Sequence, residues 1–277
     1  MKSLIFSLII GVASLSAKAD VGWATRFQSP KVNLTKDNKI RVLIVDTGVS
    51  IAVPAIAHFI KNKDDAFNCK DLHGHGTHIA GLILYGPFHL NEDGNGVVYQ
   101  KEMPCKEVEL VSCKFYTNIK DGQENQDRTK ECFKKAVDGD FSLVNYSAGG
   151  VQPNVEEFEV LKQLQAKGTQ MIVAAGNSNE NLKDSVHTYY PASYILPPYS
   201  LLNITPVGNW CEKEELCPPK YHRSNYGFIM PWEMGANVKS YDPWGRMLTL
   251  TGTSQAAAIF THNLIINKCN QIHNKGE

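Results

Sequence analysis

Three short polar segments carry side chains that could act together on an acyl group. Asp46 directly follows the apolar run at 40–45, three histidines stand within residues 73–78, and Ser254 opens a mostly apolar segment. A serine hydroxyl is a weak nucleophile until a neighbouring base takes its proton, and a histidine held by a carboxylate is a common base. The three segments therefore contain the parts for acyl transfer through a serine.

Each segment taken alone also fits an ordinary role. Asp46 could be a turn or helix-capping residue, and Ser254 could cap the helix that follows it. His73, His75 and His78 could be polar loop residues, or could bind zinc together with a further acidic ligand. A zinc hydrolase is therefore one alternative, although it leaves Ser254 without a purpose.

The elements that must position these residues follow from the apolar pattern. Short β-branched runs alternate with helix-like segments, which is typical of a parallel sheet covered by helices in one α/β domain. The stretch at 209–223, rich in charge, proline and cysteine, is predicted to be a surface excursion. Strands are predicted over residues 40–45, 108–115, 141–144, 170–175 and 201–207, and helices over residues 77–85, 128–137, 153–167 and from 254 to about 266.

The acid, the base and the nucleophile fall at strand ends or helix starts of this predicted sheet. Ligands of open α/β sheets bind beyond the carboxyl ends of the strands. Asp46 ends one strand, and His75 and Ser254 stand where two helices begin. The three side chains are therefore expected at one edge of the sheet.

The short sequence motifs around these residues resemble those of the subtilisin family of serine proteases. The order Asp, His, Ser is also the subtilisin order, which differs from that of chymotrypsin and the α/β-hydrolases. Five matches in the correct order are far more specific than any one of them. The resemblance implies an α/β fold of three α/β/α layers around a mostly parallel central sheet. The matching words are DTG at 46–48, HGTHIAG at 75–81, VNYSAGG at 144–150, AAGN at 174–177 and GTS at 252–254.

The same resemblance implies a secreted serine endopeptidase that acts on protein or peptide substrates through an acyl-enzyme. Asp46, His75 and Ser254 would form the triad, with His75 as the base. Asn177 would donate its amide to the oxyanion, together with the Ser254 N–H at its helix start. The chemistry requires no cofactor. His78, one turn along the helix, is predicted to be a structural hydrogen-bonding residue.

The resemblance also implies substrate contacts. Ser147, Ala148 and Gly149 would form the edge that pairs with the substrate backbone. Tyr189, just before the Tyr-Pro word, would form the floor of the pocket for the side chain preceding the scissile bond, and the neutral Ser178 would border it. A tyrosine ring would occupy much of that pocket, so we expect a preference for small or medium uncharged side chains.

One departure from the family supports an alternative. Residues 255–258 read QAAA, where the family commonly has Met-Ala-x-Pro. This change, and the short stretch that follows Ser254, favour a catalytically weak subtilisin-fold protein that binds or regulates. The intact set of Asp46, His75, Asn177 and Ser254 argues against it.

A loop after the histidine helix carries oxygen ligands. Asn91, Asp93 and Asn95 stand in a loop with turn-forming glycines at 94 and 96, and the loop falls where many subtilisins bind calcium. An ordinary Asn/Asp/Gly turn explains the same residues equally well. A structural calcium site and a plain turn are therefore both open.

The N-terminus has the pattern of an export signal. Lys2 precedes an apolar stretch and then small residues, so residues 1–19 are predicted to be a signal peptide cleaved after Ala19, leaving residues 20–277 as the peptidase domain. The apolar run is shorter than the roughly 20 residues that span a bilayer. The protein is therefore expected to be secreted or periplasmic, with no membrane contact after cleavage.

Charge and cysteine content agree with export. The chain has 28 Lys+Arg against 28 Asp+Glu, which argues against nucleic acid as a partner. Seven cysteines predict disulfides and at least one thiol that is free or pairs between chains. Cys211 and Cys217 flank a short loop and are predicted to pair. Sequence leaves open the natural substrate, the oligomeric state and the partners of the other five cysteines, Cys69, Cys105, Cys113, Cys132 and Cys269.

Overall fold

A computed structural model describes residues 30–90, 97–98, 105–117, 121–184, 186–210, 224–228 and 230–274 of the chain. Three predictions lie outside these residues: the signal peptide at 1–19, the pairing of Cys211 with Cys217, and the calcium loop with Asn91, Asp93 and Asn95. Of the helices in the described part of the chain, none has the length and apolar character needed to cross a membrane.

Six strands form the central sheet in the order β4-β1-β5-β6-β7-β8, and every neighbouring pair is parallel. Alternate residues of β1 are buried in different cores, with Val42 and Ile44 on one face and Leu43 and Val45 on the other. This explains the continuous apolar run, because a strand covered on both faces needs no polar side. The strands are β1 (Ile40–Asp46), β4 (Val108–Lys114), β5 (Leu143–Tyr146), β6 (Gln170–Ala174), β7 (Ile204–Trp210) and β8 (Trp232–Met234).

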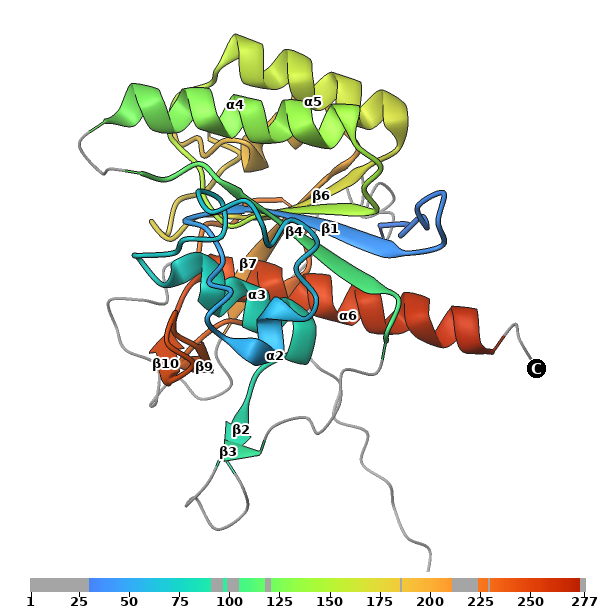
Figure 1. Ribbon diagram of the computed structural model, residues 1–277. Coiled ribbons are helices and arrows are strands. Elements are labelled where there is room, and N and C mark those ends of the chain that lie inside the picture. Colours follow the sequence, from blue (N-terminus) through green and yellow to red (C-terminus); the bar gives the residue numbers. More distant parts are fainter. Residues whose placement is uncertain are drawn as a thin grey trace, which may run out of the picture.

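Helices cover both faces of the sheet (Figure 1). The helices α4 (Gly122–Asp138) and α5 (Val155–Lys167) lie side by side on one face. The helices α3 (His75–Tyr85) and α6 (Thr253–His273) pack together on the other, beside the short α2 (Pro54–Ala57). The predicted three-layer α/β/α fold is confirmed. The smaller elements are the β2–β3 ribbon (His89–Leu90 and Val97–Val98), the β9–β10 hairpin (Val238–Tyr241 and Met247–Leu250) and the 3₁₀-helix η1 (Ala192–Ile195).

Several element boundaries differ from the sequence prediction. Helix α4 begins at Gly122, six residues before the predicted start at 128, because the Asp121 carboxylate accepts from the Glu124 N–H and caps the first turn. Helix α6 continues past 266 to His273, and Cys269 is buried in this extension. Strand β5 begins two residues later than predicted, at Leu143.

The predicted surface excursion at 209–223 is wrong at its start. Asn209 belongs to β7 and is 4% exposed. Its side-chain Oδ1 accepts from the Gly235 N–H at 2.8 Å, so the polar residue is buried with a partner. Any excursion therefore begins after Trp210, outside the described residues.

Two disulfides resolve pairings that the sequence left open. Cys105 pairs with Cys269 of α6 on one face of the sheet, and Cys113 of β4 pairs with Cys132 of α4 on the other. Cys69 is a buried free thiol whose pKa is raised to about 11, chiefly by burial. At this pKa Cys69 stays protonated and unreactive near neutral pH.

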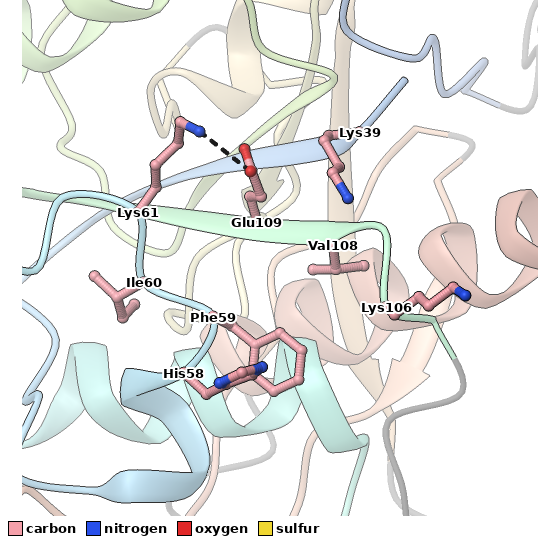
Figure 2. Close-up of a pocket in the computed structure, with 8 residues that line it drawn as sticks. All are labelled: Lys39, His58, Phe59, Ile60, Lys61, Lys106, Val108 and Glu109. Carbon is pink, nitrogen blue, oxygen red and sulfur yellow. Dashed lines mark hydrogen bonds and ion pairs between the residues drawn. The ribbon is translucent and has the colours of Figure 1, made fainter. Parts of the chain in front are cut away.

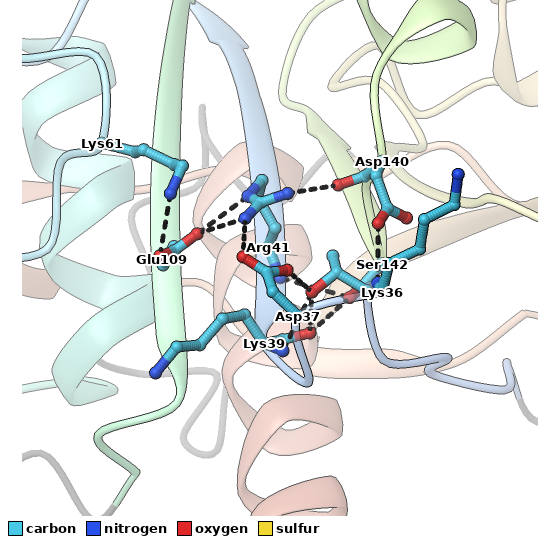
Figure 3. Close-up of polar contacts among 9 residues, drawn as sticks. Lys36, Asp37, Lys39, Arg41, Lys61, Glu109, Asp140 and Ser142 are labelled. Atoms are coloured by element: carbon cyan, nitrogen blue, oxygen red, sulfur yellow. Dashed lines mark hydrogen bonds and ion pairs between the residues drawn. The ribbon is translucent and has the colours of Figure 1, made fainter.

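The amino ends of β1 and β4 carry a charged cluster and a cavity of about 500 Å³ (Figure 2). Arg41 joins Asp37 and Glu109 there, with N–O distances of 2.8 and 2.7 Å (Figure 3). Asp46 stands at the opposite, carboxyl end of β1, so this cavity is separate from the residues discussed next. Its lining consists of Lys39, His58, Phe59, Ile60, Lys61, Lys106, Val108 and Glu109.

Candidate active site

Asp46 and His75 meet beyond the carboxyl end of β1. His75 is the first residue of α3, and its Nδ1 lies 2.7 Å from Asp46 Oδ1. The Asp46 side chain is 2% exposed, whereas that of His75 is 22% exposed. The carboxylate is therefore shielded from water while the imidazole keeps an open side. In this pair the ring donates from Nδ1, which leaves Nε2 as the basic nitrogen.

The electrostatics of His75 follow from this contact. Burial disfavours the imidazolium, but the Asp46 charge and hydrogen bond outweigh burial, with a further contribution from Asp71, so the pKa of His75 lies above its ordinary value. Asp46 Oδ2 is buried and has no hydrogen-bond partner among the described residues. The Asp46 charge is thus directed mainly at His75 and at the Thr47 N–H, which donates to Oδ1 at 2.7 Å.

The three histidines do not converge on a common point. His78 is fully buried, and its Nε2 lies 3.2 Å from the Val238 carbonyl and 3.0 Å from that of Leu248. Burial, together with the nearby His75, lowers the pKa of His78 to about 4. The prediction that His78 is structural is confirmed. His73 is exposed, with its ring 6.3 Å from that of His75.

Ser254 lies in the first turn of α6 and contacts the predicted substrate edge. Its Oγ donates to the Ser147 carbonyl at 2.9 Å, and Ser147 Oγ donates to the Ser254 carbonyl at 3.2 Å. Asn145 Nδ2 donates to Ser147 Oγ at 2.9 Å and so orients it. Among the hydrogen bonds of the described residues there is none between Ser254 and His75. Ser254 and His75 therefore lie on the packed helices α6 and α3 without a direct hydrogen bond.

Asn177 is held by the same helix start. Its Oδ1 accepts from the Thr253 N–H at 2.9 Å, so the amide Nδ2 is left to donate elsewhere. A side chain at Gly252 would bring its Cβ within 3.3 Å of that Nδ2. The glycine thus leaves room beside the amide, just before Ser254.

The Tyr189 ring lies between two glycine backbones. A Cβ at Gly149 would lie 2.7 Å from the ring, and one at Gly176 would lie 3.0 Å from it. Gly176 also has φ of +96°, which favours glycine. Burial raises the pKa of Tyr189 to about 12, so the ring is uncharged near neutral pH. The ring therefore fills the space between the segment at Gly149, which follows β5, and the turn that leads to Asn177.

Two buried polar residues beside the site were given no role by the sequence analysis. Asp71 is 5% exposed and accepts hydrogen bonds from Thr47, His73, Gly74 and Thr77. Its position, four residues before His75, suggests a helix-capping acid, and that signal was available. Asn225 is also buried, and its Nδ2 donates to the Ala175 carbonyl.

Sequence comparison decides the family. The chain matches the subtilase family over residues 37–265, which include all the residues of this site. The chain belongs to the subtilase family. The expected family membership is thereby confirmed.

Relatives of this subtilase include named proteases. It is 27% identical to subtilisin-like protease 3 of Plasmodium falciparum over 221 residues, covering 73% of this chain and 27% of that protein. It is 26% identical to the major intracellular serine protease of Bacillus subtilis over 232 residues, covering 80% of this chain and 66% of that protein. The subtilase thus spans less than two thirds of the length of either relative.

Solved structures support the fold of this subtilase. A crystal structure of a cold adapted subtilisin-like serine proteinase superimposes with a TM-score of 0.60 at 21% identity, covering 82% of this chain and 75% of that one. The self-cleaved protease domain of PatA superimposes with a TM-score of 0.59 at 19% identity, covering 85% and 82%. Both similarities concern the three-layer fold.

Proposed function

We propose that the protein is a serine endopeptidase that hydrolyses peptide bonds through an Asp46-His75-Ser254 triad. The observation that carries the proposal is the 2.7 Å contact between buried Asp46 and His75 Nδ1 in a chain of the subtilase family. A carboxylate on Nδ1 directs the basic Nε2 outward and stabilises the imidazolium that forms when the base takes a proton.

In the proposed reaction, Ser254 Oγ attacks the scissile carbonyl carbon while its proton passes to His75 Nε2. The tetrahedral intermediate then expels the amine, which takes the proton from His75, and an acyl-enzyme remains. Water then attacks the acyl-enzyme in the same way, with His75 again taking and returning the proton, which releases the carboxylic acid product and restores the Ser254 hydroxyl. For the first step the Ser254 hydroxyl must turn from the Ser147 carbonyl towards His75.

Asn177 is proposed to stabilise the oxyanion. Its Oδ1 is occupied by the Thr253 N–H, so Nδ2 is the group that is free to donate. The Ser254 N–H lies at the start of the 21-residue α6, where the helix dipole favours negative charge. Two such donors act more strongly on the transition state and the tetrahedral intermediate than on the bound substrate, because the oxygen becomes negatively charged only when the carbonyl is attacked.

Substrate contacts are proposed along the edge formed by Ser147, Ala148 and Gly149. The neighbouring Gly150 already pairs with Tyr190 through two backbone hydrogen bonds of 2.9 and 2.7 Å. With the Tyr189 ring seated against Gly149, we expect the pocket for the side chain preceding the scissile bond to be shallow and uncharged. Small or medium uncharged side chains are therefore the proposed preference.

Export is proposed from the signal peptide at 1–19 with cleavage after Ala19. The Cys105–Cys269 and Cys113–Cys132 disulfides support it, because such bonds persist in oxidising compartments. N-terminal sequencing of the mature protein should begin at Asp20. An N-terminus at Met1 on purified material from the native host would contradict this proposal.

A structural calcium ion is proposed at Asn91, Asp93 and Asn95. Binding to the native state alone stabilises it by mass action, so the melting temperature should rise with free calcium. The Asn91→Ala/Asp93→Ala/Asn95→Ala variant should lose that rise. A wild-type melting temperature that does not change with calcium concentration would contradict the proposed site.

The decisive experiment is labelling with a fluorophosphonate, followed by identification of the modified residue. An activated serine reacts and an unactivated one does not, so we expect a single label on Ser254 and none on Ser254→Ala. The alternative, a catalytically weak subtilase that binds or regulates, is favoured by the Ser254 hydroxyl resting on Ser147. A folded wild-type protein that takes no label would support that alternative and contradict the peptidase.

A further inference from the structure

A buried carboxylate outside the proposed triad joins the two segments that carry Asp46 and His75. Asp71 Oδ1 accepts from Thr47 Oγ1 at 3.0 Å and from the Gly74 N–H at 2.8 Å. Its Oδ2 accepts from the Thr77 N–H at 2.9 Å and from Thr77 Oγ1 at 2.6 Å. Asp71 thus binds the residue after Asp46 and the first turn of α3 with one carboxylate.

The two threonines cross-brace these segments in opposite directions. Thr47 Oγ1, on the loop after β1, accepts from the Gly76 N–H of α3 at 2.9 Å. Thr77 Oγ1, on α3, accepts from the Ser50 N–H of that loop at 3.0 Å. Each hydroxyl can accept from these amides because its own proton goes to Asp71. The ionised carboxylate, which only accepts, therefore sets the direction of both hydroxyls.

The two segments approach so closely that only a glycine fits at position 76. A Cβ at Gly76 would lie 2.0 Å from the Gly48 carbonyl oxygen and 3.1 Å from Asp46 Cβ. Helix α3 also has no acidic residue in its first turn, and its N-cap Gly74 offers no side chain. Asp71 supplies the missing cap from outside the helix.

We propose that Asp71 is a positioning residue for the peptidase reaction, holding Asp46 and His75 in register through Thr47 and Thr77. This inference rests on the proposed function. Asp71 acts through these threonines and need not touch substrate. Its negative charge also favours the imidazolium of His75, so removing the charge should ease deprotonation of His75. The titratable groups that act on His75 or Asp71 are Asp46, His73, His78 and Lys114.

The main test is the pH profile of kcat for Asp71→Asn, measured per fluorophosphonate-labelled site on a chromogenic peptide with alanine before the scissile bond. In this variant an NH₂ group replaces one carboxylate oxygen and faces the hydroxyl proton of Thr47 or Thr77, so that threonine can no longer donate to residue 71. We expect kcat to fall about 10- to 100-fold, with KM within about twofold, since small misplacements of reacting groups have effects of this size. The acidic limb should move to lower pH, because His75 then loses its proton more easily.

Thr47→Val separates geometry from charge. It keeps every charge but removes the hydroxyl between Asp71 and Gly76, so kcat should fall about 10-fold with the acidic limb unmoved. Thr47→Ser should restore kcat. Asp242→Asn is the matched control, since Asp242 is also buried and accepts from the Trp244 and Arg246 amides; its acidic limb should stay in place. If Asp71→Asn does not fold, Thr47→Val and Thr47→Ser decide the question.

Two results would overturn the proposal: wild-type kcat in Thr47→Val, or a folded Asp71→Asn protein whose acidic limb does not move. Failure of the proposed function is recognisable separately. In that case the wild-type protein neither takes the label nor cleaves the peptide, before any variant is made. If the wild-type protein is labelled and active, but the Asp71 and Thr47 variants keep its kcat and its acidic limb, only the positioning role of Asp71 is contradicted.

Discussion

Ser254 and Ser147 are joined by a reciprocal pair of hydrogen bonds, each hydroxyl donating to the other residue's carbonyl oxygen, at 2.9 and 3.2 Å. The bonds tie the first turn of α6 to the segment that follows β5. They also fix the Ser254 carbonyl, so that rotation about the side-chain bond of Ser254 is the motion still needed to reach His75.

Ser254→Ala should abolish peptidase activity and leave the fold intact. The lost hydrogen bond to Ser147 is worth about 1 kcal/mol, so the melting temperature should change by only a few degrees. The measurement is kcat/KM together with thermal unfolding. Substantial turnover by folded Ser254→Ala would refute the serine mechanism.

Asn177→Ala should lower kcat by about 10²–10³ with little change in KM, because the oxyanion bond strengthens only in the transition state. Asn177→Asp sharpens the test. It keeps an oxygen to accept from the Thr253 N–H and replaces only the donor, so a similar or larger loss is expected. A loss confined to KM, in either variant, would show that Asn177 binds substrate and does not stabilise the oxyanion.

Tyr189→Ala should open the pocket beside Gly149 and Gly176. The ratio of kcat/KM for a peptide with Phe before the scissile bond to that for the Ala peptide should rise by about 10-fold or more, since apolar pockets discriminate by roughly 1–3 kcal/mol per methylene. The ratio within each protein corrects for differences in folding. A wild-type enzyme that already prefers Phe, Tyr, Lys or Arg would contradict the placement of Tyr189.

His78 should make the protein less stable in acid. Its pKa is lowered to about 4 in the folded state, below the ordinary 6.5, so the unfolded chain binds the extra proton in this window. The free energy of unfolding should therefore fall as pH drops from about 6.5 to about 4, by about 3 kcal/mol from this group. His75 acts in the opposite sense, because its raised pKa favours the folded state at low pH.

Urea unfolding between pH 4 and 7 measures the slope, and His78→Gln should flatten it. Gln can still donate to the Val238 or Leu248 carbonyl but does not titrate. An identical slope in the folded His78→Gln protein would assign the acid sensitivity to other groups, such as His262, whose pKa burial also lowers.

Local sequence was sufficient to predict a parallel sheet covered by helices, and the motifs in it were sufficient to choose the candidate residues. The run at 40–45 is apolar at every position but Arg41, short and β-branched, which favours a strand covered on both faces, and the other strands were predicted from the same pattern. The motifs around Asp46, His75, Asn177 and Ser254 are each contiguous in the chain, so they could be recognised from the sequence.

Contacts between distant segments were decided only by the tertiary structure. The pairing of Cys105 with Cys269 joins residues 164 apart, and no spacing rule selects it from the alternatives. Asp71 draws its role from Thr47, 24 residues away, and the Ser254 hydroxyl takes its direction from Ser147, 107 residues away. Such hydrogen bonds depend on where folding brings a donor within about 3 Å of an acceptor, a quantity that residue type and local period do not contain.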